Sequence, residues 1–216
     1  MEYKVVRTFF INSHNHVIQD ECVAIFTVGV DKDWMRRVNT RHISLTANYL
    51  FVSRPLLTTK GFVHWTMNDS RFAYVLTLNV ETEIITQFPV PRHDGETELM
   101  YYYLPMGSYL SLLIARSKFS WEFWEMKPDT GEWTKLPNID LEAQFASYLN
   151  CILKPGGWLK SREVLVFNVR RENYNLPSQL CIACNVRTRK FHEFELDGGL
   201  QSFLAHRNSL VWMDGS

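Results

Sequence analysis

The chain has 216 residues, of which 46% are hydrophobic, 14% aromatic and only 21% charged. This composition argues against an intrinsically disordered protein, and the length fits one domain over residues 1–216. The formal net charge is zero. Proteins that bind nucleic acid through its phosphates usually carry a basic excess, so we expect no nucleic-acid partner.

The beginning of the chain, residues 1–7, lacks the apolar stretch of a secretory signal. No window approaches the roughly 18 uninterrupted apolar residues of a spanning helix, so we expect no membrane partner. The four cysteines are sparse for this length and do not indicate a disulfide scaffold. We therefore expect reduced thiols and a cytoplasmic and/or nuclear location.

One local pattern occurs four times along the chain. An apolar, alternating run ends in a polar turn, and a second short run with aromatic or branched residues follows; the four copies cover residues 24–38, 74–88, 121–136 and 180–194. The turns centre near residues 32, 82, 130 and 188, so the steps are 50, 48 and 58 residues. A period near 50 with several strands in each unit is typical of propeller blades.

Further candidate strands precede three of these hairpins, at residues 61–67, 107–115 and 162–169, and residues 209–213 resemble the opening strand of another unit. Both faces of the alternating runs are apolar, as expected for sheets covered on two sides. We expect loops at 39–42, 53–60, 90–98, 137–141, 154–160 and 171–178. The sequence therefore predicts an all-β, propeller-like array of about four antiparallel blades that forms an incomplete propeller.

A series of motifs in the same order and at similar spacing resembles the plant F-box-associated (interaction) domain. They include the opening YKVVR, a G-x-x-H-W segment at residues 61–65 and a W-x-x-W…W-T-K hairpin, and their order and spacing together are more specific than any one of them. The residues that carry the resemblance are Tyr3, Trp34, Gly61, His64, Trp65, Gly107, Trp121, Trp124 and Trp133.

This resemblance implies a kelch-like substrate receptor of an SCF-type E3 ubiquitin ligase, which would bind a target protein for ubiquitination. In that family an F-box contacts the linker subunit of the ligase. We find no F-box in these residues, so we expect the chain to be a fragment, a truncated product or a degenerate member that keeps target binding alone. The implied function is a protein-binding module and not an enzyme.

Two of the expected loops are the candidate partner-binding loops. Loop 90–98 carries a charged cluster of five residues, and an exposed acidic loop could select a basic partner. Loop 154–160 carries Trp158, which we expect to be exposed because it follows the flexible run Pro155-Gly-Gly157. The charged cluster consists of Arg92, His93, Asp94, Glu96 and Glu98.

Two other functions stay open at this point. Carboxylates at Asp94, Glu96 or Glu98 could serve a small propeller enzyme or a carbohydrate-binding protein, because glycosidases use paired carboxylates. The chain could also be an inactive family member. We identify no catalytic, cofactor-binding or metal-binding residues.

Other chemically suggestive residues have simpler explanations. The pair Cys181 and Cys184 lies within a predicted strand, where residues three apart face opposite sides, so we expect two buried small residues and no redox or zinc site. The spacing of His14 and His16 is metal-like, but a polar turn is favoured.

Structural roles are also favoured for three further features. We expect the His64 ring to be hydrogen-bonded and the Trp65 indole to pack between blades. The basic turn around residues 187–190 is interpreted as a solvated blade edge. The tryptophans other than Trp158 are expected in the core, with Trp133 as a buried example.

Overall fold

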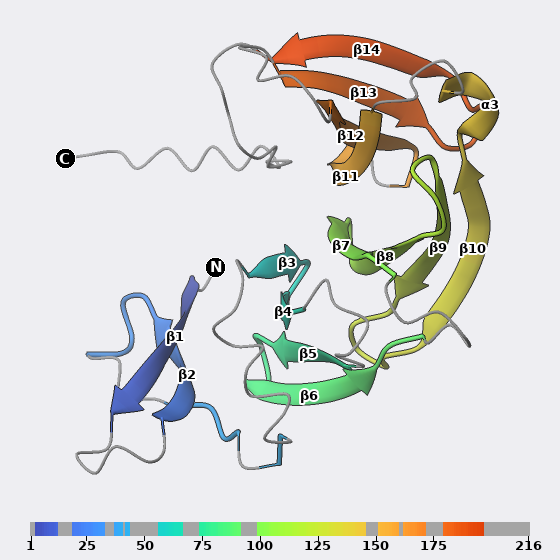
Figure 1. Ribbon diagram of the computed structural model, residues 1–216. Coiled ribbons are helices and arrows are strands. Elements are labelled where there is room, and N and C mark those ends of the chain that lie inside the picture. Colours follow the sequence, from blue (N-terminus) through green and yellow to red (C-terminus); the bar gives the residue numbers. More distant parts are fainter. Residues whose placement is uncertain are drawn as a thin grey trace. The chain divides into compact units, whose positions relative to one another are not determined.

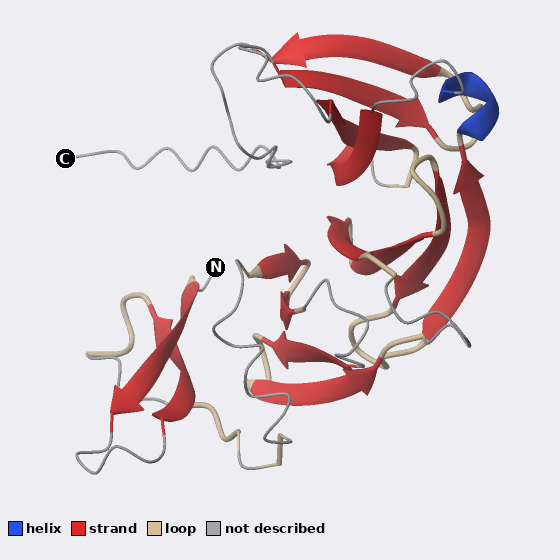
Figure 2. Ribbon diagram, viewed as in Figure 1, coloured by secondary structure: helices blue, strands red, loops and turns tan. Residues whose placement is uncertain are grey.

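A computed structural model describes the chain outside residues 1–2, 13–18, 33–36, 41, 44–55, 67–73, 92–98, 146–150, 160–161, 172–178 and 197–216. The chain divides into two compact units, Met1–Asp140 and Leu141–Ser216, and each is described by itself. The all-β prediction is confirmed. The described residues form antiparallel sheets with one short helix (Figure 2).

Three sheets make up the described part of the first unit. The strands of the first two sheets are β1 (Lys4–Asn12) and β2 (Gln19–Thr27), then β3 (Leu57–Thr59), β4 (Phe62–Trp65), β5 (Tyr74–Asn79) and β6 (Ile84–Pro89). The third holds β7 (Tyr101–Met106), β8 (Tyr109–Ala115), β9 (Ser120–Met126) and β10 (Trp133–Asp140). Figure 1 shows β1 and β2 as an antiparallel pair and the other two sheets as up-and-down meanders, in which strands that are adjacent in the sheet are also consecutive in the sequence.

The second unit holds a further four-stranded meander. Helix α3 (Glu142–Phe145) precedes β11 (Cys151–Leu159), β12 (Val164–Arg171), β13 (Gln179–Asn185) and β14 (Phe191–Leu196). The Phe145 ring lies 5.2 Å from the ring of Phe191, so the helix packs on the edge strand of its own sheet. A four-stranded antiparallel meander is the form of a propeller blade, and it occurs three times in the described residues.

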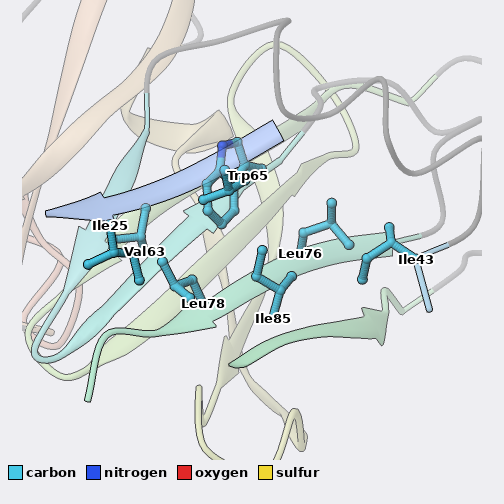
Figure 3. Packing of buried hydrophobic residues seen from close by; sticks show 8 residues of the cluster. Ile25, Ile43, Val63, Trp65, Leu76, Leu78 and Ile85 are labelled. Carbon is cyan, nitrogen blue, oxygen red and sulfur yellow. The ribbon is translucent and has the colours of Figure 1, made fainter. Parts of the chain in front are cut away.

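The sheets of the first unit are covered by apolar side chains because successive residues of a strand point to opposite faces. One face of sheet β3–β6 packs against β2 through a cluster around Trp65, which is 1% exposed (Figure 3). The members labelled in Figure 3 are Ile25, Ile43, Val63, Trp65, Leu76, Leu78 and Ile85.

The opposite face of the same sheet packs against sheet β7–β10. Val75 and Phe88 from sheet β3–β6 pack with Leu110, Leu112 and other residues of sheet β7–β10 in one core cluster. Sheet β3–β6 is therefore apolar on both faces, as the alternating runs predicted. At about 25 cal/mol per Å² of buried apolar area, this face-to-face packing is a main source of stability for the first unit.

The first copy of the repeat has a partner that the sequence did not predict, because β2 pairs along its whole length with β1, from Lys4↔Thr27 to Asn12↔Gln19. Residues 24–28 were expected to form a hairpin with a run at 34–38. Among the described residues of that run, Arg37 forms a bridge with Ala24, and the Val38 amide donates to the Val23 carbonyl at 2.8 Å. Residues 33–36, with Trp34, lie outside the described residues.

Three expected loops contain strands. Residues 53–60 were predicted as a loop, but β3 covers Leu57–Thr59. Residues 137–141 were predicted as a loop, but β10 continues to Asp140 across an irregularity between Leu136 and Ile139. Residues 154–160 were predicted as a loop, but β11 continues to Leu159 across an irregularity between Pro155 and Gly157. Both β10 and β11 are edge strands, where a bulge accommodates a proline that cannot donate to the ladder.

Candidate partner-binding surface

The turn between β5 and β6 is built on the side chain and backbone of Asn79. Its carbonyl oxygen accepts a hydrogen bond from the amide of Glu83 (2.8 Å), which closes the turn over five residues. Its Oδ1 atom accepts from the amides of Glu81 (2.9 Å) and Thr82 (3.1 Å). Glu83, the fifth residue, takes the left-handed conformation with φ 60°. We call this five-residue arrangement the corner.

The turn between β13 and β14 is the same corner in the second unit. The Asn185 carbonyl accepts from the amide of Arg189 (2.8 Å), and Asn185 Oδ1 accepts from the amides of Arg187 (3.1 Å) and Thr188 (2.9 Å). Arg189 has φ 57°. The two corners thus agree in closing bond, asparagine cap and left-handed fifth residue.

A third corner joins β9 to β10 with different side chains. The Lys127 carbonyl accepts from the amide of Gly131 (2.8 Å), which has φ 71°. Thr130 Oγ1 accepts from the Glu132 amide at 3.3 Å. A Cβ atom on Gly131 would lie 2.0 Å from the Phe88 ring, so the neighbouring sheet requires glycine here. The steps from 79 to 127 and from 127 to 185 are the predicted 48 and 58 residues.

At each of the two corners in the first unit, an ion pair within the chain neutralises a charged side chain. Glu83 accepts from Lys4 Nζ at 3.0 Å, and the same ammonium group donates to the Val80 carbonyl at 3.0 Å. Lys127 and Glu132 pair across the third corner at 3.2 Å. The Lys127–Glu132 pair is exposed and worth little energetically, but it balances the local charge.

The corner of the second unit is basic. Arg187, Arg189 and Lys190 are exposed, and among the described residues no carboxylate forms an ion pair with them. A hydrogen bond of 2.9 Å from the Val186 amide to the Glu163 carbonyl joins this corner to the turn between β11 and β12. The cations that share this end of the sheet, here called the basic end, are Arg162, Arg187, Arg189 and Lys190.

A buried histidine lies in the core of sheet β3–β6. His64 is 0% exposed, with Nε2 at 2.9 Å from Thr59 Oγ1 and Nδ1 at 3.0 Å from Thr77 Oγ1. Burial lowers the pKa of His64 to about 3, so the ring is neutral at physiological pH. Both ring nitrogens have hydroxyl partners, which confirms the predicted hydrogen-bonded ring.

A charged network lies on sheet β7–β10. Glu122 is bonded to the Arg116 guanidinium, to Lys135 Nζ at 3.1 Å and to the Trp124 indole at 3.4 Å. Lys135 also lies 5.2 Å from the Trp124 ring centre. Burial opposes ionisation of Glu122, but the hydrogen bonds from Arg116, Lys135 and Trp124 outweigh it and hold its pKa at about 2. The carboxylate is therefore charged and supports the fold.

The candidate binding loops of the sequence analysis have different outcomes. Residues 92–98, with Arg92, His93, Asp94, Glu96 and Glu98, lie outside the described residues. Trp158 was expected to be exposed, but it is 6% exposed and pairs with Leu165 inside sheet β11–β14. The prediction was wrong because the Pro-Gly-Gly run forms a bulge within a strand and does not end it.

The other motif residues occupy structural positions. Trp65 and Trp121 are buried, as expected, whereas Trp133 is only partly buried and donates its indole N–H to the Pro89 carbonyl at 2.8 Å. Gly61 and Gly107 take positive φ in the tight turns before β4 and β8. The exposed Tyr3 accepts a backbone hydrogen bond from Val28 beside β1.

The buried cysteines agree with the prediction. Cys181 and Cys184 are both 0% exposed, and Cys181 Sγ lies 3.5 Å from Asn168 Oδ1. Burial raises the pKa of Cys184 to about 11, which keeps the thiol protonated and unreactive. His14 and His16 lie outside the described residues.

Sequence reasoning overlooked the importance of the basic end. It identified the basic turn but could not show that Arg162, from another hairpin, joins it. It also could not show that the acidic corner has a cation, Lys4, from a distant strand. Both facts depend on pairing between segments far apart in sequence.

Comparisons with known proteins add no identification: no family model, no curated protein and no solved structure matches the chain. In the part of the chain that the structure describes, no group of three or more His, Cys, Asp or Glu side chains could hold a metal ion. No helix among those residues is long and apolar enough to cross a bilayer.

Proposed function

We propose that the chain is a protein-binding module that resembles the substrate-recognition part of an SCF-type ubiquitin ligase receptor, and that it is not an enzyme. The observation that carries this proposal is the corner. It is repeated at Asn79, Lys127 and Asn185, each time on the outer hairpin of a four-stranded meander. Its backbone is the same each time, whereas its exposed side chains differ.

A scaffold of constant backbone with variable turn residues is suited to recognition. Binding residues are commonly placed on turns that a rigid sheet positions, because turn residues can vary without loss of the core. Sheet β3–β6 is held by packing on both of its faces, and two of the three corners are held by asparagine caps. The side chains at corner positions such as Glu81 and Arg187 are exposed and take no part in that packing.

The chemistry of the described side chains favours binding over catalysis. The histidine with the most perturbed pKa, His64, is buried and bonded to two threonines, so it cannot reach a substrate without opening the sheet. The carboxylate with a depressed pKa, Glu122, is neutralised by two cations. Neither group has the poised, accessible character of a general acid or base.

The resemblance to F-box-associated domains supplies the biological context of this proposal. The partner would be a protein destined for ubiquitination in the cytoplasm or nucleus. Contact with the ligase linker subunit would be made by an F-box in a longer parent protein. The four-stranded meanders fit the kelch-like architecture that the resemblance implies.

Co-purification with the linker subunit tests this proposal. The product of the complete gene should bind a purified Skp-type linker subunit, whereas residues 1–216 alone should not. Failure of the complete product to bind would contradict the ligase assignment. Binding by residues 1–216 alone would contradict their assignment to the target-binding part.

A further inference from the structure

The basic end of sheet β11–β14 has two arginines where the fold favours glycine. Arg162 (φ 75°) and Arg189 (φ 57°) both lie in the left-handed region. The inner hairpins of the first unit have Gly61 or Gly107 in this conformation, and the third corner has Gly131. A non-glycine residue there carries a backbone cost. Glu83 takes the same conformation at the Asn79 corner and its carboxylate pairs with Lys4, whereas the equivalent Arg189 has no carboxylate partner among the described residues.

Among the described residues, the three cations within residues 187–190 also lack the compensation found at the other two corners. In the first unit Glu83 is paired with Lys4, and Lys127 with Glu132. At the basic end, no described carboxylate pairs with Arg187, Arg189 or Lys190. Like charges on adjacent turns repel one another, and an anionic partner would relieve that repulsion.

We propose that the basic end, formed by Arg162, Arg187, Arg189 and Lys190, is a docking surface for an acidic segment of a protein partner. This inference rests on the proposed function and defines the chemistry of its target. Guanidinium groups bind carboxylates through two parallel hydrogen bonds, so three arginines and one lysine fit closely spaced Asp and Glu side chains.

A protein segment fits this surface better than a nucleic acid. The whole chain has zero net charge, whereas nucleic-acid-binding surfaces usually extend over many cations within a basic protein. The basic end is confined to two turns of one sheet and carries one carboxylate of its own, Glu163. A surface of this size matches a few consecutive acidic residues.

Fluorescence anisotropy with a labelled decaglutamate peptide tests the proposal on the full chain. The corner variant carries Arg187→Gln, Arg189→Gln and Lys190→Gln. The matched control carries Lys32→Gln, Lys60→Gln and Lys118→Gln, which removes the same charge from exposed positions of the first unit. Because three exposed ion pairs with the peptide would be lost together, the corner variant should raise the Kd about tenfold and the control less than about twofold.

The result must separate a specific surface from general electrostatics. Equal weakening by both variants, or no binding of decaglutamate by the unaltered chain at about 20 mM salt, would overturn the proposal. Tighter binding of a ten-nucleotide single strand than of decaglutamate, lost in the corner variant, would assign the basic end to nucleic acid and overturn it equally. Unchanged circular dichroism of both variants verifies that they are folded.

The outcome is independent of the linker experiment. If decaglutamate fails to bind but the complete gene product still binds the linker subunit, the docking surface is wrong and the receptor assignment stands. If the peptide binds through the basic end but the complete product ignores the linker, the surface stands and the ligase assignment fails.

Discussion

The corner at Asn79 and the corner at Asn185 share one backbone and carry opposite charges. Both close with a 2.8 Å bond to the fifth residue and both cap two further amides with an asparagine oxygen. One presents Glu81 and Glu83 and pairs the latter with Lys4; the other presents Arg187 and Arg189. The comparison indicates that the backbone and the asparagine cap of the corner serve the fold, and that its exposed side chains, such as Glu81 and Arg187, are available for other purposes.

At the third corner the side chain cannot vary freely, and a substitution there should give the largest loss of stability. Gly131→Ala places a methyl group in the Phe88 ring and a side chain at φ 71°. Strain and overpacking together should lower the free energy of unfolding by about 2–4 kcal/mol. Urea titration followed by tryptophan fluorescence measures this.

Arg189→Ala is the matched control because it changes the equivalent position of the basic corner, where the side chain is exposed. It should alter stability by less than about 0.5 kcal/mol. Similar losses in the free energy of unfolding for Gly131→Ala and Arg189→Ala would contradict the argument that Phe88 makes position 131 special.

Glu122→Gln tests the contribution of a carboxylate that pairs with two cations, Arg116 and Lys135, within the chain. The substitution leaves Arg116 and Lys135 without their carboxylate and should cost about 1–2 kcal/mol at pH 7. The pKa of Glu122 is lowered from 4.5 to about 2 in the folded protein. Its contribution is therefore present above pH 4.5 and is lost as the pH falls toward 2.

Unfolding measured between pH 7 and pH 2 provides the readout for that variant. The difference between the unaltered protein and Glu122→Gln should shrink as the pH falls through the range from 4.5 to about 2. A difference that stays constant over this range would exclude a charged role for Glu122.

The asparagine caps of the two charged corners should contribute equally to the free energy of unfolding. Asn79→Ala and Asn185→Ala each remove two hydrogen bonds to backbone amides. By analogy with helix caps, each should cost about 1 kcal/mol, and the two costs should agree within about 0.5 kcal/mol. A large cost at one position and none at the other would break the equivalence of the corners.

Loss of the Lys4 ion pair should have a smaller effect than loss of an asparagine cap. Lys4→Gln removes a partly buried ammonium group that bonds to both Glu83 and the Val80 carbonyl. We expect a loss of about 0.5–1 kcal/mol in thermal or urea unfolding, reduced at high salt. Arg187→Gln should have no measurable effect on stability, and an equal loss there would indicate a hidden partner for Arg187.

Part of this fold could be predicted because the pattern is local. The polar turns near residues 82, 130 and 188 follow alternating apolar runs, and the corners lie there. The burial of Cys181 and Cys184 follows from the same alternation. In the first copy the Asp31 amide donates to the Thr27 carbonyl at 3.0 Å near the predicted turn, but the pairing of β2 with β1 on its other edge is a choice that local alternation does not encode.

Other features could not be predicted because they depend on contacts across strands. The run Pro155-Gly156-Gly157 has the composition of a turn, but Gly156 leaves room for Asn168, whose amide lies 2.9 Å from where a Cβ would stand. The register that places Thr77 opposite His64 is likewise absent from the local sequence. The candidate site was predicted least well, because charge compensation at a corner depends on residues as distant as Lys4 and Glu83.

The stability of the triple variant Arg187→Gln, Arg189→Gln, Lys190→Gln tests the central claim most directly. Charges that take no part in folding can be removed without loss, so the free energy of unfolding should stay within about 0.5 kcal/mol of the unaltered protein or rise as repulsion is relieved. A loss of more than about 1 kcal/mol would show that these cations hold the fold together, and would contradict the account.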